Sequence, residues 1–132
     1  MYKTTILIAL GLGAALTARA GEPDIKKLPA PAAKTGVTYA ADIKPIFEKS
    51  CFKCHGPEKQ KAKLRVDSIE AIKKGGEDGD MLGGGKSEKS RLVHSIARIL
   101  DEDENMPPEG KGDPLTKDQV ALVRAWIDQG TK

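Results

Sequence analysis

The sequence predicts an all-α domain with long loops, and three observations support that class. Apolar residues recur at the three- and four-residue spacing of an amphipathic helix in several short segments. Clusters of glycine and proline separate these segments, and no segment alternates apolar and polar residues as a β-strand does. Phe, Tyr and Trp make up only 4% of the 132 residues. A small domain with so few large apolar side chains usually gains stability from a cofactor, a metal or disulfides.

Two short helices are predicted in the first half of the chain. Residues 43–51 should form the first, with Asp42 as its N-cap and apolar side chains at helical spacing along one face. Residues 68–74 should form the second, with Asp67 as its N-cap and Gly75 as its end. The glycine-rich stretch that follows should form an irregular loop, because glycine is unfavourable in a helix.

Two amphipathic helices are predicted in the second half of the chain. Residues 88–100, capped by Ser87, place their apolar side chains in one stripe, and His94 projects away from this stripe toward solvent. Residues 117–129 begin at Thr116 with the sequence of a capping box and end before a glycine. The buried face of this last helix should include the only tryptophan of the chain.

The N-terminal residues have the pattern of an export signal. Residues 1–20 contain a basic residue, an apolar run and a small-x-small motif, and the run is too short to cross a bilayer, which takes about 20 residues. We expect cleavage before Gly21 and a periplasmic or otherwise exported protein with no membrane span after cleavage. An uncleaved N-terminal anchor is the alternative. Residues 21–38, rich in proline and alanine, should be a flexible linker, and residues 39–132 the folded domain.

Charge and loop composition argue against nucleic-acid and nucleotide binding. Residues 21–132 contain 20 basic and 19 acidic residues, and this balance does not indicate the clustered basic face that nucleic acid requires. Gly85-Lys86-Ser87 resembles the end of a phosphate-binding loop, but that motif requires glycine where Asp80 stands, and no strand precedes it. The acidic run 101–104 is either a solvated helix end or a docking surface for a basic partner.

The motif Cys51-x-x-Cys54-His55 is the attachment motif of c-type haem. Two thiols three residues apart each form a thioether with one vinyl group of the haem, and the adjacent histidine supplies an imidazole nitrogen to the iron. Covalent attachment retains the cofactor in a domain too small to hold it by packing alone. The haem then supplies the core that the scarce aromatic residues do not, so the predicted cofactor is one covalent haem c.

Three other interpretations of the cysteines compete with haem attachment. A thioredoxin-like redox pair would need a βαβ context, which the sequence pattern does not show. A zinc site would combine the motif with His94, although the adjacent ligands Cys54 and His55 would be unusual. A disulfide between Cys51 and Cys54 would be sterically tight. The export signal favours haem, because c-type haem is attached outside the cytoplasm.

A low-spin haem that transfers electrons needs a second iron ligand, and Met106 is the favoured candidate. Two prolines follow it and stiffen the backbone, and it lies 51 residues after His55, which leaves room for the chain to fold around the haem. Met81 lies in a flexible glycine-rich stretch and is expected to pack on the haem or the core. A ligand at His94 and an open sixth position are the alternatives.

Several short motifs follow one another along residues 39–131. They are Asp42-Ile43-Lys44-Pro45-Ile46-Phe47, Cys51-x-x-Cys54-His55-Gly56, Leu64-Arg65-Val66-Asp67, Gly75-Gly76, Gly85-Lys86-Ser87, Ser90-Arg91-Leu92, Met106-Pro107-Pro108, and Leu115-Thr116 with Trp126-Ile127-Asp128-Gln129-Gly130. Together they resemble the planctomycete-type cytochrome c domain, within the wider class of monohaem class I cytochromes c. Gly84 departs from similar sequences, which often have proline there.

The resemblance implies a small cytochrome c-like helical domain over residues 39–132, wrapped around one covalently bound haem. It implies thioethers at Cys51 and Cys54, with His55 and Met106 as the iron ligands. It also implies that the first helix packs against the last helix near the haem. The family's domains are often fused to larger partners, and no such partner is written in this sequence.

The motif and the resemblance together predict an electron carrier rather than an enzyme. A monohaem c-type cytochrome would cycle its iron between Fe(II) and Fe(III) and exchange electrons with donor and acceptor proteins. The alternative is a haem enzyme or sensor, such as a small peroxidase, with an open or exchangeable sixth position. Arg65 is favoured over Lys63 and Arg98 for a contact with the haem propionates, and an ordinary surface arginine is the alternative.

Overall fold

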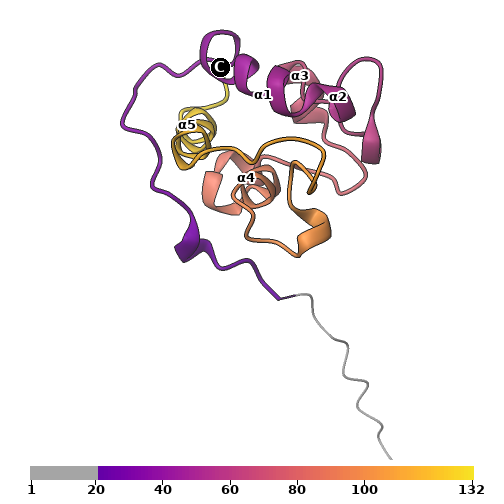
Figure 1. The fold of residues 1–132 in the computed structure, drawn as a ribbon. Coiled ribbons are helices and arrows are strands. Elements are labelled where there is room, and N and C mark those ends of the chain that lie inside the picture. The colour runs from indigo at the N-terminus through magenta and orange to yellow at the C-terminus, as the bar shows by residue number, and fades with distance from the viewer. Residues whose placement is uncertain (1–20) are drawn as a thin grey trace, which may run out of the picture.

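The computed structural model describes residues 21–132, and this part of the chain consists of helices and loops without a β-strand (Figure 1). A π-helical turn (Tyr39–Ile43) leads directly into the first α-helix, and short 3₁₀ turns lie between the later helices. The all-α class predicted from the sequence is therefore confirmed. The predicted signal peptide lies outside the described residues. The α-helices are α1 (Lys44–Ser50), α2 (Phe52–His55), α3 (Ile69–Lys74), α4 (Arg91–Ile96) and α5 (Lys117–Asp128).

The predicted caps of the first two helices are wrong by a few residues. The turn before α1 is capped by Thr38, whose hydroxyl accepts from the Ala41 N–H at 3.3 Å, while the Asp42 carboxylate accepts from the Thr38 N–H at 2.9 Å. α3 is capped by Ser68, whose hydroxyl accepts from a backbone N–H at 3.1 Å. Asp67 is engaged elsewhere, in an ion pair, so the neighbouring serine takes the capping role.

The third predicted helix is much shorter than its apolar stripe suggested. α4 covers only Arg91–Ile96, and its N-cap is Ser90, whose hydroxyl accepts from the Val93 N–H at 3.2 Å. Ser87, the expected cap, begins a separate 3₁₀ turn (Ser87–Lys89). The helix stops early because Arg98 turns into the left-handed region, with φ of 58°.

The fourth predicted helix is confirmed with its caps. α5 begins at Lys117 with a capping box, in which the Thr116 hydroxyl accepts from the Gln119 N–H at 3.1 Å and the Gln119 side chain accepts from the Thr116 N–H at 2.9 Å. The helix stops before Gly130, which has φ of 99°. The prediction succeeded because the capping box at Thr116 and the glycine at position 130 mark the two ends of the helix in the local sequence.

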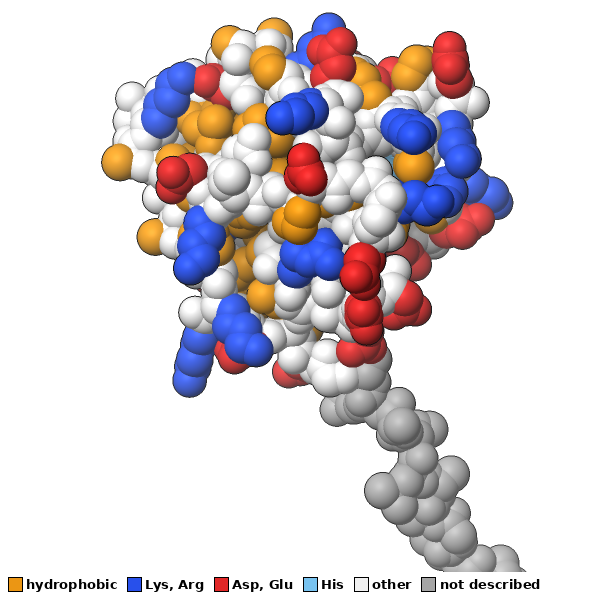
Figure 2. Space-filling model, viewed as in Figure 1, with side chains coloured by type: hydrophobic (Ala, Val, Ile, Leu, Met, Phe, Trp, Pro, Cys, Tyr) orange, Lys and Arg blue, Asp and Glu red, His pale blue; other side chains and the backbone are white. Residues whose placement is uncertain are grey.

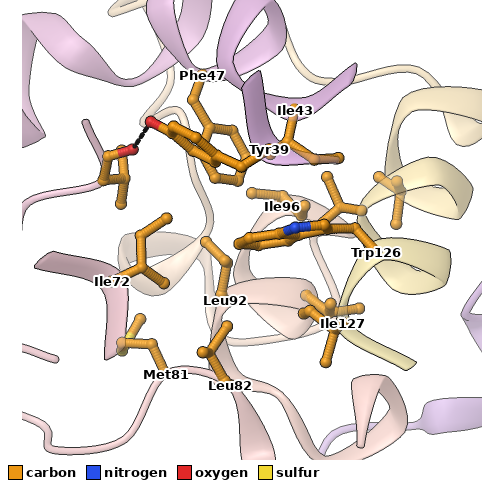
Figure 3. Close-up of a cluster of buried hydrophobic side chains, with 14 of the residues drawn as sticks. Tyr39, Ile43, Phe47, Ile72, Met81, Leu82, Leu92, Ile96, Trp126 and Ile127 are labelled. Atoms are coloured by element: carbon orange, nitrogen blue, oxygen red, sulfur yellow. Dashed lines mark hydrogen bonds between the residues drawn. The ribbon is translucent and has the colours of Figure 1, made fainter. Parts of the chain in front are cut away.

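Trp126 of α5 lies at the centre of the core and is fully buried (Figure 3). Its ring centroid lies 5.9 Å from that of Tyr39 and 6.5 Å from that of Phe47 in α1, with the Phe47 ring at 86° to the indole. The first and last helices therefore pack together, as the resemblance implied. The labelled apolar side chains around this aromatic group include Ile72, Met81, Leu82, Leu92, Ile96 and Ile127 (Figure 3).

The segment expected to be a linker runs along α5 (Figure 1). The Ala32 N–H donates to the Ala121 carbonyl at 2.9 Å, and the Arg124 guanidinium donates to the Pro29 carbonyl. Val37 is only 2% exposed. Contacts with the domain thus begin before residue 39, which the sequence analysis did not anticipate, because few apolar residues mark this segment. Its flexibility and the boundary at residue 38 stay predictions.

Basic and acidic side chains are interspersed on the face of the molecule shown in Figure 2. The acidic run predicted to be a solvated helix end or a docking surface contains a 3₁₀ turn (Glu102–Glu104). Arg91 pairs with Glu104 at 2.5 Å and with Asp78 at 3.4 Å, so part of the acidic charge is neutralised within the domain. Within residues 21–132, no helix has the length and apolar character needed to cross a membrane.

Candidate functional site

One cavity brings together four residues that the sequence analysis singled out: Cys51, Cys54, His55 and Met106. It encloses about 620 Å³ of space that no protein atom fills, part of it open to solvent. The remaining lining residues are Ser50, Lys53, Lys61, Ala62, Pro107, Pro108 and Lys111.

The two cysteines lie at either end of one helical turn. The Cys51 carbonyl accepts from the N–H of Cys54 at 3.1 Å and from the N–H of His55 at 2.9 Å, so the backbone from 51 to 55 is wound tightly. Residues three apart in a helix share a face, which places both thiols on the cavity side with the histidine next to them. Both thiols are free rather than joined in a disulfide.

Burial raises the pKa of the Cys51 thiol to about 12, and the nearby Cys54 adds a smaller upward contribution. Such a thiol stays protonated at neutral pH. A thioredoxin-type redox cysteine requires the opposite, a lowered pKa that exposes a thiolate. The environment of Cys51 therefore does not fit the thioredoxin-like interpretation.

The imidazole of His55 is oriented by a hydrogen bond to the segment that contains Leu64 and Val66. Nδ1 lies 3.2 Å from the Leu64 carbonyl oxygen, which can only accept, so in the neutral ring Nδ1 is the proton donor and Nε2 has the lone pair. The Val66 N–H donates to the His55 carbonyl at 2.9 Å, and the Tyr39 hydroxyl donates to the Val66 carbonyl at 2.7 Å. A backbone carbonyl on Nδ1 is the arrangement that orients a metal-binding histidine through Nε2.

Met106 reaches the cavity from a loop that is anchored to the end of α4. Its N–H donates to the Ser95 carbonyl at 3.0 Å, and the guanidinium of Arg98 donates to the Pro107 carbonyl at 2.8 Å. Met81 is instead buried in the core, 8% exposed, and does not line the cavity. This is one of the two places expected for Met81, and it leaves Met106 as the methionine on the cavity wall.

The comparisons with known proteins agree with this geometry. Residues 51–110 match the family model described as Planctomycete cytochrome C. This stretch of the chain is therefore similar to planctomycete cytochrome C. The match begins at the first cysteine of the motif and extends four residues beyond Met106. It therefore includes the four residues of the cavity that the sequence analysis singled out. Neither the curated proteins nor the solved structures gave a match to the chain.

The residues of this cavity fit a haem c. The family implies that cofactor, and the paired thiols, the free imidazole nitrogen and the thioether are the donor set that c-type haem uses. Cavity walls contributed by Ala62, Pro107 and Pro108 are apolar, as the face of a porphyrin requires. The number of haems and the role of each residue are predictions that the family match does not test.

Three lysines line the cavity, whereas Arg65 does not, and its contact with the haem propionates stays a prediction. Arg65 donates two hydrogen bonds to Asp67, at 2.9 and 2.6 Å, and is not among the lining residues. Of the two other candidates, Lys63 lies 3.9 Å from Glu77, and Arg98 is bound to the Met106 loop. Sequence reasoning missed the three lysines at positions 53, 61 and 111. Of these, only Lys53 could have been found from the sequence, because it lies between the two cysteines of the motif.

His94 does not point to solvent, and that expectation was wrong. The residue is 8% exposed, and Nε2 lies 2.7 Å from the Glu88 carbonyl oxygen. A helical projection assumed one straight helix over 88–100, whereas the chain folds back in a 3₁₀ turn before α4. N-terminal residues Pro23 and Ile25 also line a shallow cavity beside His94. A helical projection includes only the residues of one helix, so it cannot predict that a distant segment covers one of its side chains.

The four side chains of the zinc interpretation are not brought together. Among residues 21–132, no group of three or more His, Cys, Asp or Glu side chains is arranged to hold a metal ion. His94 lines a cavity different from that of the two cysteines. A structural zinc site needs four ligands converging on one point, and this arrangement does not supply them.

Proposed function

We propose that this chain is a monohaem c-type cytochrome that acts as an electron carrier. One observation supports the proposal most directly: Met106 lines the same cavity as the motif Cys51-x-x-Cys54-His55 although it is distant in sequence. Cys51 and Cys54 would hold one haem c through thioethers. His55 would face the iron through Nε2, and Met106 would occupy the remaining axial position.

A haem with these ligands supplies one-electron Fe(II)/Fe(III) chemistry, and a thioether ligand raises its potential relative to two histidines. The chain's own residues support a carrier that changes little between the two states. The Leu64 carbonyl fixes the imidazole of His55, and the end of α4 fixes the backbone on both sides of Met106. Pro107 and Pro108 keep the adjoining wall apolar, which limits the access of water.

The partners would be redox donor and acceptor proteins with acidic contact surfaces. Lys53, Lys61 and Lys111 are exposed and line the cavity, and no acidic side chain lines it with them. A positive rim of this kind steers encounter with a negative surface. The same lysines would serve as partners for the haem carboxylates in place of Arg65, whose guanidinium is held by Asp67.

The compartment would be the periplasm or another exported space. This part of the proposal rests on the sequence of residues 1–20, which has the order of basic, apolar and small residues found in export signals. Haem attachment at a Cys-x-x-Cys-His motif takes place outside the cytoplasm. Neither nucleic acid nor nucleotide is expected as a partner.

A haem enzyme or sensor would need an open or exchangeable sixth position. The small peroxidase-like alternative therefore requires Met106 to leave the cavity wall, whereas the backbone on both sides of Met106 is hydrogen-bonded to α4 and the turn after it. No observation favours such an enzyme over the carrier.

The experiment is a spectroscopic study of the protein matured with haem c in a host that exports it. A pyridine haemochrome spectrum should give one covalent haem per chain, and a redox titration should show one reversible electron. The oxidised protein should show the weak sulfur-to-iron charge-transfer band of methionine ligation. Met106→Ala should abolish that band and lower the reduction potential, because the thioether that favours Fe(II) is lost.

Met81→Leu is the matched control, because Met81 is buried in the core away from the cavity. Its band and potential should equal those of the unmodified protein. The carrier proposal is rejected by a protein that binds no haem, or by an oxidised protein that binds cyanide rapidly and lacks the sulfur band. A band that persists in Met106→Ala but disappears in Met81→Leu would assign the ligand to the other methionine.

A further inference from the structure

Arg98 occupies the position just beyond the end of a helix where glycine is the usual residue. α4 ends at Ile96, and the Arg98 N–H donates to the Ser95 carbonyl at 3.2 Å. The Ile99 N–H donates to the His94 carbonyl at 3.1 Å. These two bonds form a Schellman motif, whose first residue beyond the cap adopts a left-handed conformation. Arg98 has φ of 58°, which is unfavourable for a residue with a side chain.

The same chain ends α5 with the same motif and uses glycine there. The Gly130 N–H donates to the Ile127 carbonyl, and the Thr131 N–H donates to the Trp126 carbonyl, both at 3.0 Å. Gly130 has φ of 99°. Since glycine suits this position in one helix, the helix end by itself does not account for the arginine in the other.

The side chain of Arg98 has a specific partner in the Met106 loop. Its Nη1 donates to the carbonyl of Pro107 at 2.8 Å, directly after Met106 in the sequence. On the other side, the Met106 N–H donates to the Ser95 carbonyl at 3.0 Å. The turn that ends α4 thus holds the backbone both before and after the sulfur-bearing residue, although Arg98 does not itself line the cavity.

The segment between the end of α4 and Met106 is held together by its own hydrogen bonds. The Asn105 side chain accepts from the Leu100 N–H and donates to the Leu100 carbonyl, each at 3.3 Å. Asn105 is 7% exposed, and the Ser95 hydroxyl donates to the Glu104 carbonyl. Residues 100–105 therefore form a compact loop, and Arg98 holds its far end.

We propose that Arg98 is a positioning residue that holds Met106 against the cavity in the geometry needed to bind iron. The inference rests on the proposed function, because it requires Met106 to be an axial ligand. The Arg98 side chain reaches the Pro107 carbonyl, which glycine could not, and this contact offsets the unfavourable φ. Residues in sparsely populated backbone conformations commonly occur where function requires them.

The decisive variant is Arg98→Gly in the haem-loaded protein. Glycine suits the left-handed position, so the helix end keeps its geometry while the guanidinium donor is lost. Free imidazole competes with methionine for the iron, so its apparent affinity measures how well Met106 is held. A hydrogen bond from a charged donor corresponds to about a tenfold change, and we expect imidazole to bind about tenfold more tightly to Arg98→Gly. The denaturant midpoint followed by far-UV circular dichroism should be unchanged or higher.

Arg124→Met is the matched control. Arg124 also donates to a proline carbonyl, that of Pro29, but it lies on α5 and does not line the cavity. This variant should lower the denaturant midpoint and leave the imidazole affinity at its original value. Arg98→Lys, which keeps the charge and a donor, should fall between Arg98→Gly and the unmodified protein.

Two results would overturn the inference. The first is an imidazole affinity that is unchanged in both Arg98→Gly and Arg98→Lys while the sulfur-to-iron band still depends on Met106. That result removes the role of Arg98 and leaves the carrier proposal intact. The second is a native protein without a Met106-dependent band, which removes both. An equal rise in imidazole affinity in Arg124→Met would also count against Arg98, because it would show a general loosening of the domain.

Discussion

Nδ1 of His55 lies 3.2 Å from the carbonyl oxygen of Leu64, and this contact determines which ring nitrogen is available to a ligand in the cavity. The carbonyl accepts only from a protonated nitrogen, so in the neutral imidazole Nε2 is the nitrogen that carries the lone pair. The segment that provides the carbonyl is itself fixed, because the Tyr39 hydroxyl donates to Val66 at 2.7 Å. The histidine of the motif is therefore oriented by residues that lie well outside the motif.

His55→Gly should remove the nitrogen ligand of the bound haem and leave a space of the size of imidazole. We expect a high-spin spectrum, and added free imidazole should restore a low-spin spectrum, as measured by visible absorption. His94→Ala should leave the spectrum unchanged, because its Nε2 is bonded to the Glu88 carbonyl at 2.7 Å and it does not line the cavity. A normal spectrum in His55→Gly would contradict the assignment.

Replacing both cysteines should remove the covalent link to haem. Cys51→Ala/Cys54→Ala should yield an unstable protein whose haem is extracted by acidic acetone and whose denaturing gel shows no haem stain. Each single variant keeps one thiol, so a stained band should remain in both. Haem that stays with the double variant through extraction would show that attachment does not use these thiols.

Trp126→Ala should lower the free energy of unfolding by about 3–5 kcal/mol, because a fully buried aromatic ring is replaced by a cavity. Trp126→Phe should cost less, since it keeps a ring but loses the hydrogen bond from Nε1 to the Lys132 carbonyl, 3.0 Å long. Guanidinium denaturation of the haem-loaded proteins measures both. Ile25→Ala, at a side chain that is 49% exposed, should change the free energy by less than about 0.5 kcal/mol. Equal stability of Trp126→Ala and the unmodified protein would contradict the packing described.

The Arg65–Asp67 pair should contribute to the pH dependence of stability. Hydrogen bonds from Arg65 hold the pKa of Asp67 below its usual value of 3.8. A lowered carboxyl pKa stabilises the fold above the ordinary value, and this contribution is lost as the pH falls toward the folded-state pKa. Asp67→Asn should therefore be less stable at neutral pH, and its difference from the unmodified protein should shrink below about pH 4.

The measurement for Asp67 is the free energy of unfolding across the acid range. Asp113→Asn is the control, because Asp113 is exposed and forms none of the ion pairs found in residues 21–132. The free energy of unfolding of Asp113→Asn should stay close to that of the unmodified protein at every pH. A constant Asp67→Asn difference from neutral to acid pH would show that the ion pair does not contribute through ionisation.

Features that depend on residues close together in the chain were predictable. The capping box of α5 and the glycine after it are local signals, and both were found where expected. The two thiols and His55 share one side because three residues nearly complete a helical turn. Met106 was singled out for the stiffness of the two prolines after it, and it lies on the cavity.

Features that depend on competition between near neighbours were not predictable. Both Asp67 and Ser68 are good N-caps, and the choice of Ser68 follows from the ion pair that occupies Asp67. In the same ion pair, Arg65 donates two hydrogen bonds to Asp67, a contact that the sequence analysis did not anticipate. N-cap preferences alone do not show which of Asp67 and Ser68 caps the helix, because they do not account for Arg65, which binds Asp67.

The sequence by itself determined the helical class, the last helix, the paired thiols and the histidine beside them, since each depends on contacts within a few residues. Only the tertiary structure decided the burial of His94, the packing of residues 29–37 on α5 and the lysines of the cavity. It also ended α4 at Ile96 and tied Arg98 to Pro107. Each of these depends on which distant segment covers or binds a side chain, and helical periodicity carries no information about segments outside the helix.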